Sequence, residues 1–195
     1  MPDALSLDPA RTALLVMDVQ NDVVGNHATD SGPLVARLEH LVAAARRRGV
    51  QVIFVVVGFR PGYPEASPKN QAFAAIKQAR RLVLGTPGAA IHASLTPRDD
   101  EVVVVKHRVS ALAGTDLEVV LRAAGIDTLI LTGIATSGVV LSTLRQAADQ
   151  DYRCVVVSDG CADRDAEVHR VLVERLFPKQ ARVVDTGELL AALGG

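Results

Sequence analysis

The stretch DTLILTGIATSGVVLSTLRQAADQDY, residues 127–152, contains an apolar run, a turn flanked by glycines and an amphipathic segment. The apolar run predicts a strand over 127–132, because it is short and apolar on both faces. The segment 138–149 places apolar residues at helical spacing and predicts a helix. A strand, a tight turn and a helix in this order form the unit from which parallel sheets with helical layers are built.

The same unit recurs along the chain. Further apolar runs predict strands at 12–17, 51–57, 102–106, 153–158 and 181–184, and helical patterns occupy 31–49, 115–124, 165–176 and 186–193. This alternation predicts an α/β fold, a three-layer α/β/α sandwich around a six-stranded parallel sheet with Rossmann-like topology. The length of 195 residues is typical of one domain, so we expect residues 1–195 to form a single domain.

Two segments add local detail to this pattern. In the first helix, Ser31 is a candidate N-cap, Pro33 falls in the first turn and Gly49 ends the helix. Residues 58–101 are rich in proline and glycine, which predicts long loops around one helix near 70–80. Loops of this length commonly cover a binding site.

Composition argues against several classes of partner. The chain has 21 Lys and Arg against 22 Asp and Glu, without a basic block, so we expect no nucleic-acid partner. Its apolar runs are far shorter than the ~20 residues of a membrane span, so we expect no membrane association. Cys154 and Cys161 show neither metal-ligand nor redox spacing. These features predict a cytoplasmic protein with reduced thiols.

Polar side chains gather where the predicted strands end. Asp18 and Gln20 follow the first strand, Lys106 ends the third, and the fourth leads into the turn near Gly133. Because open α/β sheets bind ligands at the carboxyl ends of their strands, we expect these residues to share one edge. Taken singly, a carboxylate after a strand is as often a turn or helix cap, and a strand-end lysine is usually unremarkable in function. Together, beside a helix N-terminus, they indicate proton transfer or an anionic substrate.

Several separated motifs carry a resemblance to a known family. LLVMDVQND (14–22), VVVVKHRVSA (102–111) and TGIATSGVVLST (132–143) resemble, in the same order, motifs of the isochorismatase-like hydrolase superfamily, also called cysteine hydrolases. The resemblance implies that Asp18 is the family's acidic residue and Lys106 the basic member of its Asp-Lys-Cys triad. Aligning the third motif on the pattern G-x-x-T-x-x-C-V puts Gly133 and Thr136 on the motif, and Val139 where the cysteine belongs.

Other departures from the family pattern bear on the chemistry. Metal-dependent nicotinamidases have an Asp-x-His segment after the second strand, where this chain has GFRPGYPE (58–65), so we expect neither metal nor cofactor. Val23 and Leu112 replace aromatic residues usual in amide-cleaving relatives. Isochorismatases of siderophore and phenazine pathways also lack the cysteine, and the resemblance implies that such a site cleaves a vinyl ether by protonation from its aspartate.

Three functional hypotheses follow. The first is a hydrolase of a small, anionic metabolite with Asp18 as general acid and Lys106 as charge stabiliser; the second is a non-catalytic small-molecule-binding or regulatory homologue. The third is an amidohydrolase with a substitute nucleophile such as Ser137, although this serine is expected to be an N-cap. The predicted substrate-binding residues are Gln20, Arg108, Gly133, Ile134, Thr136, Ser137 and Gly138. Homo-oligomers are common among such proteins, so we expect a dimer or tetramer.

Overall fold

A six-stranded parallel sheet forms the centre of the molecule. The computed structural model describes residues 5–27 and 32–194. The strands are β1 (Thr12–Met17), β2 (Gln51–Val57), β3 (Val102–Lys106), β4 (Thr128–Ile134), β5 (Arg153–Ala162) and β6 (Arg182–Val184). They lie in the order β3-β2-β1-β4-β5-β6, and every pair is parallel. The predicted fold class is confirmed, and the strand order reverses between β1 and β4.

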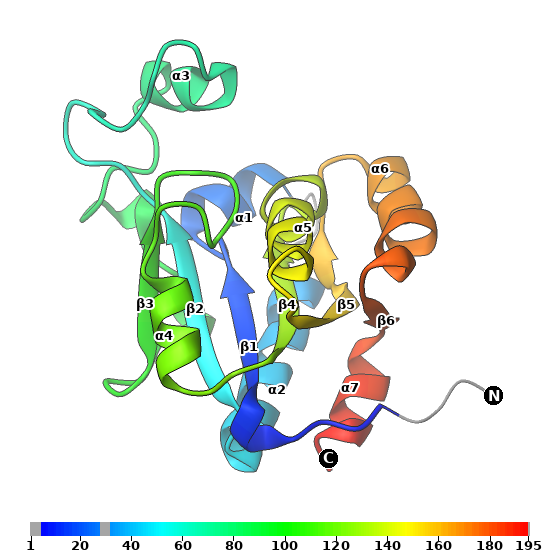
Figure 1. Ribbon diagram of the computed structural model, residues 1–195. Helices are drawn as coiled ribbons and strands as arrows, with labels where there is room; N and C mark the ends of the chain where they lie inside the picture. The colour runs from blue at the N-terminus through cyan, green and yellow to red at the C-terminus, as the bar shows by residue number, and fades with distance from the viewer. Residues whose placement is uncertain (1–4, 28–31, 195) are drawn as a thin grey trace.

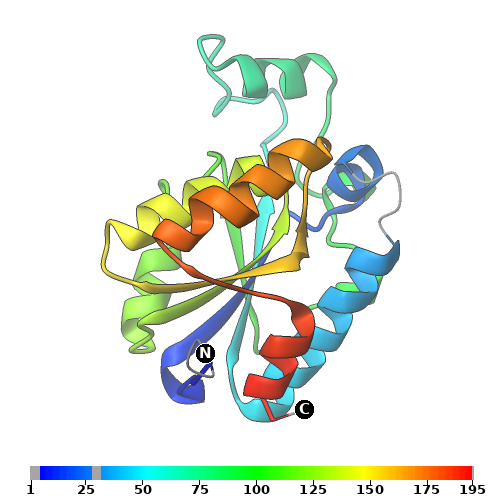
Figure 2. The same ribbon diagram turned by 90° about the vertical axis from the view of Figure 1, so that its right-hand side faces the viewer.

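Helices cover both faces of this sheet (Figures 1 and 2). On one face lie α2 (Gly32–Arg48) and α7 (Thr186–Ala192), and on the other lie α4 (Leu117–Ala123), α5 (Leu141–Ala148) and α6 (Ala166–Val171). The helix α3 (Gln71–Gln78) projects from the body beyond the carboxyl ends of the strands. A further helix, α1 (Asn21–His27), follows β1 directly and was not among the predicted helices.

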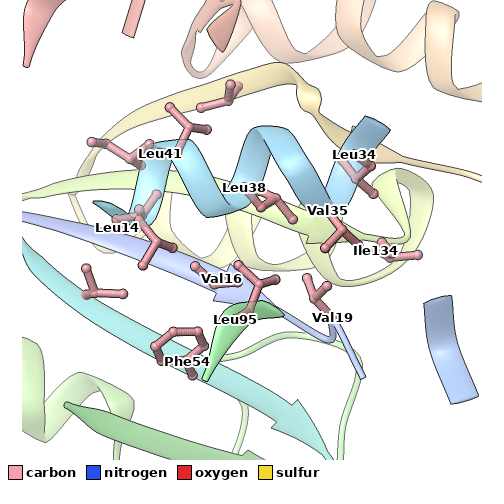
Figure 3. Packing of buried hydrophobic residues seen from close by; sticks show 14 of the residues in the cluster. Leu14, Val16, Val19, Leu34, Val35, Leu38, Leu41, Phe54, Leu95 and Ile134 are labelled. Atoms are coloured by element: carbon pink, nitrogen blue, oxygen red, sulfur yellow. The ribbon is translucent and has the colours of Figure 1, made fainter. Parts of the chain in front are cut away.

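The alternation of side chains along the strands builds one hydrophobic cluster on each face. Leu14 and Val16 of β1 pack with Phe54 of β2 beneath Leu38 and Leu41 of α2 (Figure 3). The intervening residues of β1 point to the other cluster, below α4 and α5. Burial of one such side chain contributes at most about 1.5–3 kcal/mol. Because both faces of the inner strands are covered, those strands had to be apolar throughout, which is the pattern that predicted them; the edge strand β3 exposes Val103 and Val105.

Two strands are longer than predicted. β4 continues through Ile134 and β5 through Ala162, with Gly133 paired to Cys161 after an irregularity in the ladder. The segment SDGCAD (158–163) is turn-like in its polar residues, yet it belongs to β5 through Ala162. Ser158 and Asp159 lie within the irregular end of the strand and do not mark a chain reversal. Ser31, the predicted N-cap of the first long helix, lies outside the described residues. Within the described part of the chain, no helix has the length and hydrophobicity needed to cross a membrane.

Gly133 lets β4 approach the end of β1 closely. Its φ is +129°, and an added Cβ atom would lie 2.0 Å from the carbonyl oxygen of Met17, its partner in the ladder. A backbone atom held in a central strand cannot move aside as a flexible side chain can. The sequence at this position is therefore restricted to glycine by both conformation and space.

We predict that Gly133→Ala lowers the free energy of unfolding by at least about 2 kcal/mol, because the methyl group collides with the backbone of β1. Gly25 is the matched control, since an added Cβ at this position in α1 meets nothing within 4 Å. Gly25→Ala should be neutral or stabilising by up to about 1 kcal/mol. Urea denaturation of both variants measures the difference, and equal stabilities would contradict the assigned close approach.

Candidate active site

A buried ion pair lies at the carboxyl edge of the sheet. Nζ of Lys106, at the end of β3, is 2.8 Å from Oδ2 of Asp18, directly after β1. β2 lies between these strands, so the long lysine side chain reaches across the end of β2. Both side chains are less than a tenth exposed. The two residues predicted as catalytic are thus brought into contact by strands that are not neighbours.

Local backbone contacts hold both partners in place. Asp18 adopts a left-handed conformation with φ of +56°, which aspartate tolerates better than most residues, and its N–H donates to Val55 O at 2.8 Å. Nζ of Lys106 also donates to Arg108 O at 3.1 Å. A buried ion pair adds little net stability because desolvation offsets the attraction. Its place at the ligand-binding edge therefore makes it a candidate for chemistry rather than for support of the fold.

The chain leaves β4 through a tight turn with π-type hydrogen bonding, η4 (Thr136–Val140), which leads directly into α5. Val139 lies in this turn, two residues before α5, whereas the predicted helix over 138–149 included it. Its side chain is 2% exposed and belongs to the hydrophobic cluster below α4 and α5, which also contains Met17, Ala111 and Leu112. The position aligned with the family cysteine thus holds an aliphatic side chain packed against its surroundings.

Backbone amides of this turn are engaged within the protein. The N–H of Ser137 donates to Oδ2 of Asp163 at 2.7 Å, and the N–H of Gly138 donates to Ala135 O at 3.0 Å. Two of the groups predicted to hold a substrate therefore already have partners. The expected N-cap role of Ser137 is wrong, because the turn begins at Thr136 and places exposed Ser137 inside it. Neither η4 nor α5 has a side-chain cap.

The segment around α6 supports the turn from outside. Nδ1 of His169 lies 2.8 Å from Oγ1 of Thr136, which is fully buried. The next residue of the turn, Ser137, contacts Asp163. Burial lowers the pKa of His169, an effect that the nearby Asp163 carboxylate opposes. Burial alone would raise the pKa of Asp163, but hydrogen bonds from Ser137 and nearby amides lower it overall. Sequence analysis missed both supports, because only the folded chain brings α6 to the turn.

Two predicted substrate-binding residues have differing environments. Gln20 is fully buried; its amide donates to Val57 O and Ala89 O and accepts from the N–H of Val57. These hydrogen bonds connect Gln20 with the end of β2 and with the loop that contains Ala89. Arg108 is exposed, and its Nη1 donates to His107 O at 2.6 Å and to Glu65 O at 3.2 Å. Gln20 therefore serves the structure, whereas the guanidinium of Arg108 is exposed at the surface beside the backbone of Glu65.

The remaining candidates are buried. Ile134 packs in the cluster beneath α2 (Figure 3), so only its backbone is left to contact a substrate. Burial raises the pKa of the Cys154 thiol to about 11 and that of Cys161 to about 12. Thiols with such pKa values stay protonated near neutral pH and are poor nucleophiles. The structure thus supplies no reactive cysteine at either position.

The loop after β2 lacks the features of a metal site. In the segment GFRPGYPE, Arg60 and Glu65 form an ion pair with 2.5 Å between Nη1 and Oε1. Across residues 5–27 and 32–194, no three His, Cys, Asp or Glu side chains are grouped so that they could hold a metal ion. The expectation of a metal-free site stays a prediction.

Known proteins resemble the chain over nearly its whole length. The family model described as Isochorismatase domain matches residues 12–188. The ureidoacrylate amidohydrolase RutB of Methylobacterium radiotolerans is 35% identical, covering 99% of this chain and 83% of the relative. The uncharacterized isochorismatase family protein YecD of Escherichia coli O157:H7 is also 35% identical, covering 97% of this chain and all of the relative.

Solved structures show the same similarity. An isochorismatase family protein from Burkholderia thailandensis has a TM-score of 0.84 at 32% identity, covering 99% of this chain and 100% of the other. A cysteine hydrolase from Pseudomonas syringae pv. phaseolicola has a TM-score of 0.87 at 25% identity, covering 100% and 99% of the two chains. The architecture is therefore shared with both.

The contact between His169 and Thr136 predicts a pH dependence of stability. Because the pKa of His169 is lowered in the folded state, the unfolded chain takes up this proton first as the pH falls. The contribution to the free energy of unfolding therefore decreases on acidification through the ordinary histidine range, roughly pH 7 to 5.5. His169→Asn keeps a polar group without a titrating ring and should flatten this dependence.

Urea denaturation at several pH values measures the effect, with His40→Asn at an exposed position of α2 as control. The control should retain the slope of the unsubstituted protein. An unchanged slope in His169→Asn would show that this histidine is not buried in its neutral form.

Proposed function

Since the chain belongs to the isochorismatase family, we propose that it is a hydrolase of a small, anionic metabolite, with Asp18 as general acid and no covalent cysteine intermediate. The observation that carries this proposal is the buried contact between Asp18 and Lys106 at 2.8 Å. It is supported by the place of that contact, at the carboxyl edge of a parallel sheet beside the reversal of strand order.

The ion pair is the form without substrate; in the proposed mechanism, Asp18 carries a proton in the substrate complex and transfers it to the substrate. For a vinyl ether, the proton goes to the terminal alkene carbon, water adds to the resulting oxocarbenium carbon, and the hemiketal breaks down to a carbonyl compound and an alcohol. The ammonium of Lys106 stabilises the carboxylate that Asp18 becomes. A proton released when water adds restores the acid form of Asp18, so that no group is consumed.

A mechanism without a thiol fits the side chains near the turn. Val139 has no group that can attack a carbonyl, and the raised pKa values of Cys154 and Cys161 keep both thiols protonated. Ser137 is exposed, while the imidazole of His169 contacts Thr136 Oγ1. The carboxylate that contacts Ser137 is Asp163, whose lowered pKa makes it a weak base for amide cleavage through Ser137, although one relative is named an amidohydrolase.

The substrate class rests on charge. Ureidoacrylate, in the name of the RutB relative, is a small carboxylate. Arg108 follows Lys106 by two residues and has an exposed guanidinium. The backbone carbonyl of Arg108 accepts a hydrogen bond from the ammonium of Lys106. A carboxylate bound at this edge meets positive charge from both side chains, which favours an anionic metabolite.

The alternative is a homologue that binds a small molecule without converting it. It is favoured by the internal hydrogen bonds of Ser137 and Gly138 and by the packing of Val139, which leave fewer groups for a reacting substrate. The two functions differ in what Asp18 supplies. A catalyst requires its proton, whereas a binding protein requires only its shape or charge.

We further propose a cytoplasmic protein that assembles with copies of itself. Both cysteines are unpaired and buried, as suits a reducing compartment. Apolar side chains are exposed on the outermost strand β3, at Val103 and Val105, and nearby in the chain at Val109. Exposed apolar side chains along an unpaired edge strand favour association with another chain.

We predict that Asp18→Asn lowers kcat by about 10²–10⁴-fold, because an amide cannot donate a proton of suitable acidity. It also leaves Lys106 buried beside a neutral group, at a cost of roughly 3–5 kcal/mol in stability. The double variant Asp18→Asn/Lys106→Met removes both charges and is the matched control for folding. Isochorismate, ureidoacrylate and nicotinamide form the first assay panel, with binding measured by calorimetry.

Loss of turnover with retained binding in folded Asp18→Asn supports the acid role, and the double variant separates this loss from a loss of stability. If the unsubstituted protein and Asp18→Asn bind one of these compounds equally and neither converts it, the binding function replaces the hydrolase.

The interpretation of Val139 predicts that Val139→Cys creates a reactive thiol. Cysteine is smaller than valine, so the exchange should cost only about 1 kcal/mol in packing. Burial in the cluster raises the pKa of such a thiol, as it does for Cys154 and Cys161, but position 139 also lies at the start of a helix, which favours the thiolate. The new thiol should react with iodoacetamide at neutral pH faster than Cys154 and Cys161, as followed by peptide mass spectrometry.

Adding Lys106→Met to this variant should slow the reaction. A folded variant whose new thiol is as inert as the native ones would show that Val139 does not occupy a nucleophile position.

A further inference from the structure

A pocket of about 520 Å³ lies at the amino edge of the sheet, opposite the candidate active site. Residues 5–8 before β1 form one side, and the amino ends of β4, β5 and β6 form the other. Figure 1 shows the segment before β1 running along this lower edge, near α7. The volume is within the range of small-molecule sites, roughly 300–1,000 Å³.

Strand register sets two arginines on the same face of the sheet inside this pocket. Arg153 of β5 pairs with Thr128 of β4, and Arg182 of β6 pairs with Val155 of β5. Paired residues in a ladder point to the same face, as do residues two apart along a strand. Arg153, Val155 and Arg182 therefore project to the same face of the sheet. The two arginines are diagonal neighbours on adjacent strands, because Arg182 lies opposite Val155, two residues beyond Arg153.

The acidic residues of the pocket have other partners. Oδ2 of Asp127 accepts from Arg11 Nε at 2.9 Å and from Nη2 at 2.6 Å, and Asp8 accepts from the N–H of Ala10. The charge of Arg153 also helps to lower the pKa of Asp127, after the larger effect of Arg11, but within the described residues neither Arg153 nor Arg182 is at ion-pair distance from a carboxylate. Like charges on neighbouring strands repel, and an anion between them removes that repulsion.

The rest of the pocket is suited to an apolar group. Val155 is buried in the cluster beneath α2, and Leu5 and Leu7 pack against the same cluster from the segment before β1. Leu5 and Leu7 are only partly buried, so they leave apolar surface on this side of the pocket. A ligand with both an acid group and a compact hydrocarbon body matches the charged and the apolar sides together.

We infer that this pocket is a second binding site, which takes a small organic acid. Its carboxylate lies between Arg153 and Arg182, and its hydrocarbon body lies against Leu5, Leu7 and Val155. The site is separate from Asp18 and Lys106, which lie at the carboxyl ends of the strands. The inference is independent of the reaction proposed above.

The sequence contains no tryptophan, so Leu7→Trp places a single fluorophore in the pocket wall. The probe is 4-nitrobenzoate, an aromatic carboxylate that quenches indole, and neutral 4-nitrobenzamide is its matched control. We expect saturable quenching by the acid and at least about 10-fold weaker binding in Leu7→Trp/Arg153→Gln/Arg182→Gln, since hydrogen bonds to charged groups are the strong ones. Adding Arg175→Gln instead, at an exposed arginine of η5 (Leu172–Leu176), should leave the affinity unchanged.

Calorimetry of 4-nitrobenzoate with the protein that retains Leu7 provides a measurement free of the new side chain. Saturable binding there, weakened in Arg153→Gln/Arg182→Gln and retained in Arg175→Gln, supports the site. Absence of saturable binding, equal binding of the amide, or an affinity unchanged by loss of both arginines would overturn it.

Discussion

The close approach of β4 to β1 at Gly133 and Met17 fixes where Asp18 and the turn after β4 lie relative to each other. At this point, the chain has no room for a Cβ atom, and the two strands diverge immediately afterwards. Asp18 turns through a left-handed conformation towards β2 and β3, while Ile134 turns towards α2. The gap that opens between diverging strands is the reason that sheets of this topology bind ligands there.

The strands could be predicted because their burial leaves little freedom of composition. β1, β2 and β3 begin and end as predicted, since each is a valine- or leucine-rich run bounded by polar or turn-forming residues. The sequence could also predict that Asp18 and Lys106 lie close together, because all carboxyl ends of a parallel sheet share one edge. The side chain of Lys106 is long enough to reach from β3 across the end of β2 to Asp18, which a shorter side chain could not do.

Features that depend on tertiary contacts could not be predicted in the same way. His169 is 33 residues from Thr136, and nothing in the helical pattern around it marks which residue faces the turn. Gln20 follows β1 as a catalytic residue could, yet its amide satisfies backbone groups of Val57 and Ala89 that would otherwise be buried without partners. The polar residues near Cys161 indicated a turn because the sequence does not show that β5 continues beside Gly133.

The support of the turn by α6 bears on how a site without a thiol can persist. Asp163 and His169 hold Ser137 and Thr136 through a carboxylate and a ring nitrogen, and neither contact involves Val139. The geometry of the turn is therefore maintained by polar contacts on one side and by packing of Val139 on the other. Because these supports are independent of the nucleophile position, a change of that side chain alters the chemistry of the edge without dismantling it. Asp18 and Lys106 are held by other strands, so proton transfer remains available to the site when nucleophilic attack is not.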